Sequence, residues 1–227
     1  MATLSGRKPR LAVLASGRGS NLQAVLDAIE GGRLELELAG VFSDRPDAAA
    51  LDRVAPALRW SRRARDYPDR MLFDADLAAA IEAVAPDWVL CAGYMRILGE
   101  AFVQRFQGRL LNVHPSLLPL YKGLHTHARV LEAGDAEHGA SVHFVVPELD
   151  AGTVVAQARI PVLPADTAQS LAERLLPQEH RLVVGVMALA AAGRLAERDG
   201  QVRLDGHTLF SPLRLDSSGM LLPGPSA

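Results

Sequence analysis

The chain has 227 residues, of which 49% are hydrophobic and 22% charged, and its net charge is −2 at pH 7. This balance is typical of a globular protein with a sizeable core, and it lacks the basic excess of a nucleic-acid-binding protein. Cys91 is the single cysteine, which excludes an internal disulfide and favours a reducing, cytoplasmic compartment. The longest apolar stretch, residues 182–193, is shorter than the roughly 20 residues of a membrane helix, so we expect no membrane partner.

The first part of the chain alternates strands and helices. An apolar run at residues 10–16 predicts a strand, and the loop "GRGSN" connects it to a helix at 22–31. A second strand ends at Asp44, a second helix covers 48–55, and a weaker strand covers 57–60.

The alternation continues to the middle of the chain. A helix at 74–84, a strand at 87–93, a short helix at 101–106 and a strand at 108–114 follow one another. Strands and helices in this order predict a parallel sheet with helices on both of its faces.

The pattern changes after this point. Two strand-like runs, 139–146 and 153–162, have no helix between them and should pair antiparallel. A long helix at 167–193, which Pro177 should kink, closes the domain. We therefore expect an α/β fold with an open, mixed but mainly parallel sheet, helices on both faces, and antiparallel strands in the C-terminal half. A single domain should cover residues 1–205, and a loosely packed tail residues 206–227.

The loop after the first strand, "SGRGSN", is a candidate anion site. A glycine loop that enters a helix exposes backbone N–H groups and the positive end of the helix dipole. The loop lacks the third glycine of a dinucleotide fingerprint and the Gly-Lys-Ser/Thr of a P-loop. It therefore favours a single phosphate over NAD or ATP, and its candidate contacts are Gly17, Gly19, Ser20 and Asn21. The alternative is a plain tight turn in which Ser20 caps the helix.

The stretch "LLNVHP" ends a buried strand with two polar side chains. Asn112 and His114 must share one side of the strand, and Val113 the other. At the carboxyl end of a parallel strand the amide is placed to donate to a developing oxyanion, and the imidazole to carry a proton near neutral pH. The alternative is a core histidine bonded to a backbone carbonyl.

Asp150, in the segment "ELDAG" between the two antiparallel strands, is the third candidate. A sharp turn at Ala151-Gly152 would present its carboxylate to His114, orienting the imidazole and favouring its charged form. The alternative is an aspartate that stabilises its own turn.

The chain is also rich in histidines. His125, His127, His138 and His143 accompany His114, yet no familiar metal-ligand spacing joins them, so we expect no metal. A nucleophile-elbow motif is absent as well, which favours direct transfer between bound reactants over a covalent enzyme intermediate.

Taken together, "LASGRGSNLQAVLDA", "CAGYMRIL", "QEH" and the block from Gly108 to Gly152 resemble one family closely. The chain is similar, from about Arg10 to about Leu204, to the phosphoribosylglycinamide formyltransferase family, the folate-dependent enzymes of purine synthesis. The resemblance implies that a formyl group passes from 10-formyltetrahydrofolate to the primary amine of glycinamide ribonucleotide. No metal is needed, and the partners are these two small molecules. We expect a monomer or a homodimer.

The resemblance also implies roles for individual residues. The catalytic residues would be Asn112, His114 and Asp150, and Glu179 would bind the ribose beside a phosphate loop at Gly19, Ser20 and Asn21. The pterin pocket would be lined by segments 95–98 and 146–150. The expected folate contacts are therefore Arg70, which would meet the glutamate tail, together with Met95, Arg96, Ile97, Leu98, Asn112, Val146, Pro147, Glu148 and Leu149.

Under this resemblance, residues 10–112 form the phosphate-binding half and residues 113–205 the folate-binding, catalytic half. Lys122 and Ala151 depart from the family pattern, where proline and glycine are usual. One alternative keeps the folate and changes the acceptor, as in a formyltetrahydrofolate deformylase or a methionyl-tRNA formyltransferase. The others are a non-catalytic nucleotide-sensing module and a metal-dependent hydrolase.

Overall fold

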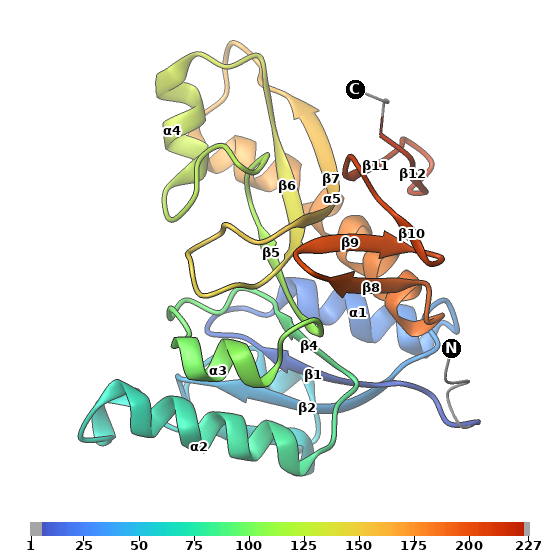
Figure 1. Ribbon diagram of the computed structural model, residues 1–227. Helices are drawn as coiled ribbons and strands as arrows, with labels where there is room; N and C mark the ends of the chain where they lie inside the picture. Colours follow the sequence, from blue (N-terminus) through green and yellow to red (C-terminus); the bar gives the residue numbers. More distant parts are fainter. Residues whose placement is uncertain (1–5, 225–227) are drawn as a thin grey trace.

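The computed structural model describes residues 6–224, and its first half is a parallel sheet (Figure 1). Its five strands are β1 (Arg10–Leu14), β2 (Glu37–Ser43), β3 (Arg59–Ser61), β4 (Trp88–Cys91) and β5 (Leu110–His114). They lie in the order β3-β2-β1-β4-β5, all parallel. The parallel sheet expected from the alternation of strands and helices is confirmed.

Three helices connect these strands: α1 (Ser20–Glu30), α2 (Arg70–Ala83) and α3 (Glu100–Arg105). Helix α2 begins one turn earlier than expected, because the Asp69 side chain accepts a hydrogen bond from the backbone N–H of Leu72 and caps the helix.

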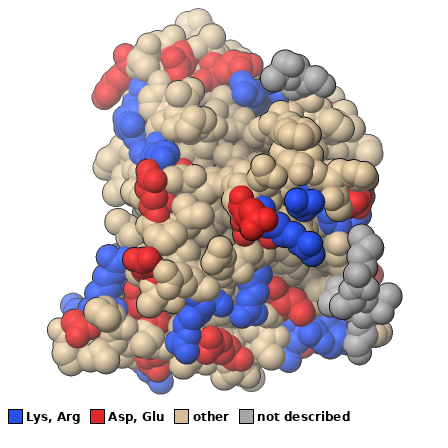
Figure 2. Space-filling model, in the orientation of Figure 1, with Lys and Arg blue, Asp and Glu red and all other residues tan. Residues whose placement is uncertain are grey.

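Figure 2 shows acidic and basic side chains interspersed over the face seen in Figure 1.

The expected helix at 48–55 is wrong, since only the 3₁₀ turns Leu51–Arg53 and Pro56–Leu58 form there. A proline disfavours helical backbone in the residue before it, and Ala55 is accordingly extended. A third 3₁₀ turn, Ala64–Asp66, follows β3.

The second half adds antiparallel strands. β6 (Glu137–Phe144) pairs antiparallel with β7 (Val154–Pro161), as expected, and on its other side it pairs antiparallel with β5. α4 (Thr126–Ala133), which the sequence reading missed, precedes β6. α5 (Ala168–Ala191) is capped by Thr167 and continues through Pro177.

The segment after α5 is more ordered than expected. β8 (Leu195–Arg198), β9 (Gln201–Leu204) and β10 (His207–Thr208) form a small antiparallel sheet. β11 (Leu213–Leu215) pairs parallel with β7 and antiparallel with β12 (Leu221–Leu222), so both extend the main sheet. Residues 206–224, expected to be a loosely packed tail, thus contain short paired strands, and Leu213 is the buried residue among them. Residues 225–227 of that tail, and 1–5 of the expected domain, lie outside the described residues.

Helices cover both faces of the sheet. Alternate residues of β1 belong to different cores: Leu11 and Val13 pack with α1 and α5, whereas Ala12 and Leu14 pack with α2 and α3. No helix within residues 6–224 is long and apolar enough to cross a membrane. The chain passes from β1 outward through β2 and β3, then returns to β4 on the other side of β1. This reversal is the place where open α/β sheets bind ligands.

Candidate active site

A cavity of about 120 Å³ lies at this reversal. Its walls are residues 17–21, which follow β1, and Ala92 and Gly93, which follow β4. Ser16 joins the neighbouring strand ends: its hydroxyl donates to Asp44 Oδ1 at 2.6 Å and accepts from the Met95 N–H at 2.9 Å. The loop expected to hold a phosphate therefore lines a cavity at the carboxyl edge.

Gly19 is the N-cap of α1, and no side chain caps the helix. The alternative in which Ser20 is the cap is therefore wrong. Gly19 has φ +70°, and a Cβ there would lie 2.7 Å from the Ala50 Cβ, so only glycine fits without strain. The first N–H groups of α1 lack intrahelical partners, and no side chain within residues 6–224 satisfies them, which leaves them for an anion.

Asn21 and Glu179 connect α1 to α5. The Asn21 amide donates to Glu179 Oε2 at 3.2 Å, and both side chains are buried. Burial raises the pKa of the Glu179 carboxyl. The Asn21 Oδ1 is buried without a partner among the described residues. The two residues expected at the phosphate and the ribose thus lie in contact.

Asn112 lies directly opposite His143 in the β5–β6 pairing. The Asn112 Nδ2 is 3.1 Å from His143 Nε2, and His143 Nδ1 is 2.8 Å from the Phe144 carbonyl oxygen. A carbonyl can only accept, so Nδ1 carries the proton and Nε2 accepts from the Asn112 amide. Burial lowers the pKa of His143 and keeps this ring neutral.

His114 lies between a backbone carbonyl and a carboxylate. Its Nε2 is 3.0 Å from the Tyr121 carbonyl oxygen, and its Nδ1 is 3.4 Å from Asp150 Oδ2. The His114 side chain is 8% exposed, as is that of Asp150. Both ring nitrogens therefore face oxygen acceptors, an arrangement that suits the doubly protonated ring.

Asp150 joins the two histidines. Its Oδ1 is 3.7 Å from His143 Nε2, and its Oδ2 accepts a hydrogen bond from the Gly123 N–H at 2.8 Å. Asp150 has φ +48°, a conformation that aspartate tolerates better than most residues. Asp150, distant in sequence from Asn112 and His114, thus forms one cluster with them, and His143 is its fourth member.

The sequence reading named His143 only among the abundant histidines. The signal that would have singled it out is the pairing of β5 with β6, because the cross-strand partner of Asn112 is then the side chain that touches its amide. The Gly123 N–H and the Tyr121 carbonyl were also missed, since backbone groups leave no trace in residue type.

The residues expected to meet the folate lie in two segments beside this cluster. Arg70 donates to the Ile97 carbonyl oxygen at 2.6 Å, so it reaches the segment 95–98. Leu98 is buried, whereas Met95 and Ile97 are exposed; in the second segment Val146, Pro147, Glu148 and Leu149 are exposed. Tyr94 and Val145, which precede the two segments, pack against the same core as Leu98.

Two charged residues of these segments, Arg96 and Glu148, have partners of their own. The Arg96 guanidinium lies 5.0 Å from the centre of the Phe73 ring. Lys122, which departs from the family pattern, places its Nζ 3.5 Å from Glu148 Oε1. This ion pair joins the loop after β5 to the loop after β6.

The remaining histidines do not join the cluster. His127 Nδ1 is 2.9 Å from His138 Nε2, whereas His125 is the left-handed residue before α4. Within residues 6–224, no group of three or more histidine, cysteine, aspartate or glutamate side chains is arranged to hold a metal. Burial raises the pKa of the Cys91 thiol to about 12, so it is a poor nucleophile.

Fold and site together define an α/β enzyme with a ligand site at the carboxyl edge of its sheet. The formyl transferase family model matches residues 9–187. Phosphoribosylglycinamide formyltransferase of Escherichia coli (strain K12) is 45% identical over 201 residues, which cover 88% of this chain and 95% of that protein. The chain therefore belongs to the formyl transferase family.

Solved structures agree with this assignment. The phosphoribosylglycinamide formyltransferase of Coxiella burnetii has a TM-score of 0.84 and 43% identity, covering 89% of this chain and 96% of that chain. A formyltetrahydrofolate deformylase from Pseudomonas syringae has a TM-score of 0.79 at 22% identity, covering 88% of this chain and 66% of that chain. The second likeness shows the fold alone.

Proposed function

We propose that this enzyme transfers the formyl group of 10-formyltetrahydrofolate to the primary amine of glycinamide ribonucleotide, a step of purine synthesis. The observation that carries the proposal is the cluster of Asn112, His114, His143 and Asp150 beside the cavity at β1 and β4. β5 lies two strands from β1, or about 10 Å at the usual strand spacing. If the N-terminus of α1 holds the phosphate, the rest of a ribonucleotide spans this distance to the cluster.

The nucleotide would be held by groups with complementary chemistry. The free N–H groups at the start of α1 would take the phosphate, and Glu179 would accept from the ribose hydroxyls through the oxygen that Asn21 does not use. The exposed apolar side chains of Met95, Ile97 and Leu149 offer a surface for the pterin, and the Arg70 guanidinium offers a cation for the glutamate carboxylates.

In the reaction, the substrate nitrogen attacks the formyl carbon and forms a tetrahedral intermediate. Negative charge develops on the formyl oxygen, where the second N–H of Asn112 would stabilise it, joined by the Nε2–H of His114 once that group leaves the Tyr121 carbonyl. Asp150 would hold the imidazole charged and accept the proton that the amine loses. The intermediate then breaks its bond to folate N10, which takes up a proton, giving the formylated amide and tetrahydrofolate.

The test follows the absorbance change as 10-formyltetrahydrofolate is consumed, with glycinamide ribonucleotide present and then omitted. Turnover that requires the ribonucleotide supports the proposal. Equal consumption without it would show that water is the acceptor, as in a deformylase.

A further inference from the structure

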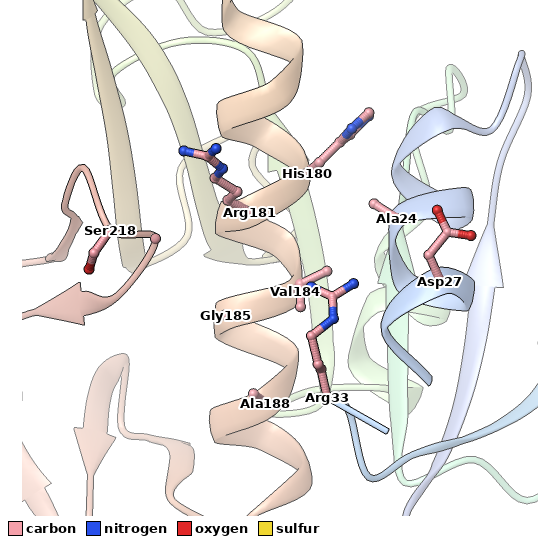
Figure 3. Close-up of a pocket in the computed structure, with 10 residues that line it drawn as sticks. Ala24, Asp27, Arg33, His180, Arg181, Val184, Gly185, Ala188 and Ser218 are labelled. Atoms are coloured by element: carbon pink, nitrogen blue, oxygen red, sulfur yellow. The ribbon is translucent and has the colours of Figure 1, made fainter. Parts of the chain in front are cut away.

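A second, larger cavity lies between α1 and α5, with a volume of about 410 Å³ (Figure 3). Helix α1 contributes Ala24 and Asp27, helix α5 contributes residues between His180 and Ala188, and the turn between β11 and β12 contributes Ser218 and Gly219. We call this cavity the α1–α5 groove. It has the volume of a typical small-molecule site.

The rim of the α1–α5 groove is basic. Arg33 and Arg181 lie on opposite sides of α5 in Figure 3, and both are exposed. Neither guanidinium forms a hydrogen bond or an ion pair with any residue from 6 to 224. Asp27 is the only carboxylate among the described lining residues, and its Oδ1 already accepts from the Gln23 amide at 2.7 Å. Two free guanidinium groups at one cavity favour an anion with several acceptor oxygens.

The floor of the groove is apolar and made of small side chains. Val184, Gly185 and Ala188 form it along α5, and Ala24 faces them from α1. The His180 ring turns toward α1, where burial lowers its pKa, so this ring adds no charge at neutral pH. A flat or aliphatic body would fit this floor, and the second oxygen of Asp27, which has no hydrogen-bond partner among the described residues, can accept from hydroxyl groups.

The α1–α5 groove is separate from the proposed active site, because none of its lining residues holds the formyl donor or the ribonucleotide. Ser218 and Gly219 also lie beyond residues 9–187, the part that matches the family model. The α1–α5 groove and the proposed active site nevertheless use neighbouring residues of the same two helices. His180 follows Glu179 directly, and Ala24 lies one helical turn after Ser20.

We propose that the α1–α5 groove binds a phosphorylated metabolite of nucleotide size, with phosphate oxygens on Arg33 and Arg181, hydroxyl groups on Asp27, and its body on the floor at Gly185. The site goes beyond the proposed function and does not depend on it.

The test is an amide ¹H–¹⁵N NMR titration of the full chain with adenosine 5′-monophosphate, and with adenosine and inorganic phosphate as separate arms. The amides of Gly185, Ala188 and Gly219 report on the groove, and those of Gly17 and Gly19 on the phosphate loop. The nucleotide should shift the groove amides with an affinity at least tenfold higher than that of either fragment. Arg33→Gln/Arg181→Gln should weaken this binding at least tenfold, whereas Arg198→Gln, on an exposed arginine of β8, should not change it.

Three outcomes would overturn the proposal. Shifts confined to the phosphate-loop amides would show that the groove is empty of nucleotide. If inorganic phosphate alone shifted the groove amides with the same affinity as the nucleotide, a nucleotide-sized ligand would not be needed. Binding that survives the double substitution would show that the arginines do not hold the phosphate. Unchanged formyl transfer to glycinamide ribonucleotide by the double variant, measured without adenosine 5′-monophosphate, confirms that the variant is folded.

Discussion

The Asn112 amide donates a hydrogen bond to His143 Nε2 at 3.1 Å, and the backbone carbonyl of Phe144 fixes the tautomer that accepts it. The amide therefore has one orientation, in which Nδ2 keeps a second N–H free. His143 is in this way a positioning residue for the group that would stabilise the oxyanion.

The positioning role of His143 is testable by a double-mutant cycle. Asn112→Ala should lower kcat by about a hundred- to a thousandfold, the usual loss of one oxyanion donor. His143→Leu should lower kcat by about tenfold or more in the native background and far less when Asn112 is already alanine, because both act through the same N–H. Additive losses in steady-state kinetics would refute the coupling.

Asp150→Asn should lower kcat by about a hundred- to ten-thousandfold, as expected when a general base is removed. The substitution keeps the side-chain oxygen that accepts from the Gly123 N–H, so the turn should survive and folate affinity should change little. The kcat–pH profile and the folate Kd measure the two effects separately. A variant with near-normal kcat would exclude a catalytic role for Asp150.

Glu179→Gln should raise the KM for glycinamide ribonucleotide by about tenfold to a hundredfold, the range for a lost hydrogen bond to a charged group. The KM for the folate should stay unchanged, since Glu179 is not among the residues expected to meet the folate. Equal increases in both constants would indicate a structural defect instead.

The same Glu179 substitution should also change stability. Because burial raises the pKa of this carboxyl above its unfolded value, the stability it confers is present at low pH and is lost as the pH rises through the folded pKa. Glu179→Gln should therefore be more stable than the native chain at neutral pH and lose this advantage in acid. Urea unfolding at both pH values measures the difference.

Gly19→Ala should destabilise the fold by at least about 1–2 kcal/mol, the cost of a left-handed alanine, and the contact with Ala50 adds to it. Gly17→Ala is the matched control, because a Cβ there meets no atom within 4 Å and φ is not in the left-handed range. Thermal unfolding of the two variants should differ clearly, and equal Tm values would contradict the steric account.

Stability should also fall in acid because of His138. Burial lowers the pKa of His138 to about 4 in the folded chain, whereas the ordinary value is 6.5. Between these two pH values the unfolded chain therefore binds a proton at His138 and the folded chain does not. The free energy of unfolding should therefore decrease from about pH 7 toward pH 4. His138→Gln should flatten this slope in urea titrations, and an unchanged slope would assign the acid sensitivity elsewhere.

Sequence reasoning predicted the strands β1 to β7, most helices and the polar ends of β1 and β5, because periodicity and turn residues carry that information locally; it did not predict β8 and β9. It also placed Asp150 beside His114. It did not identify His143 as the partner of Asn112, since that contact depends on the register of β5 against β6. It missed the order beyond residue 205 as well, where short strands such as Leu213–Leu215 gain their stability from the sheet edge they join and not from their own sequence.

The most direct test of the account measures kcat and the folate Kd of His114→Ala together. Formyl transfer to glycinamide ribonucleotide should fall at least about a hundredfold, with folate still bound at near-native affinity. A His114→Ala enzyme that turns over at the native rate would contradict it.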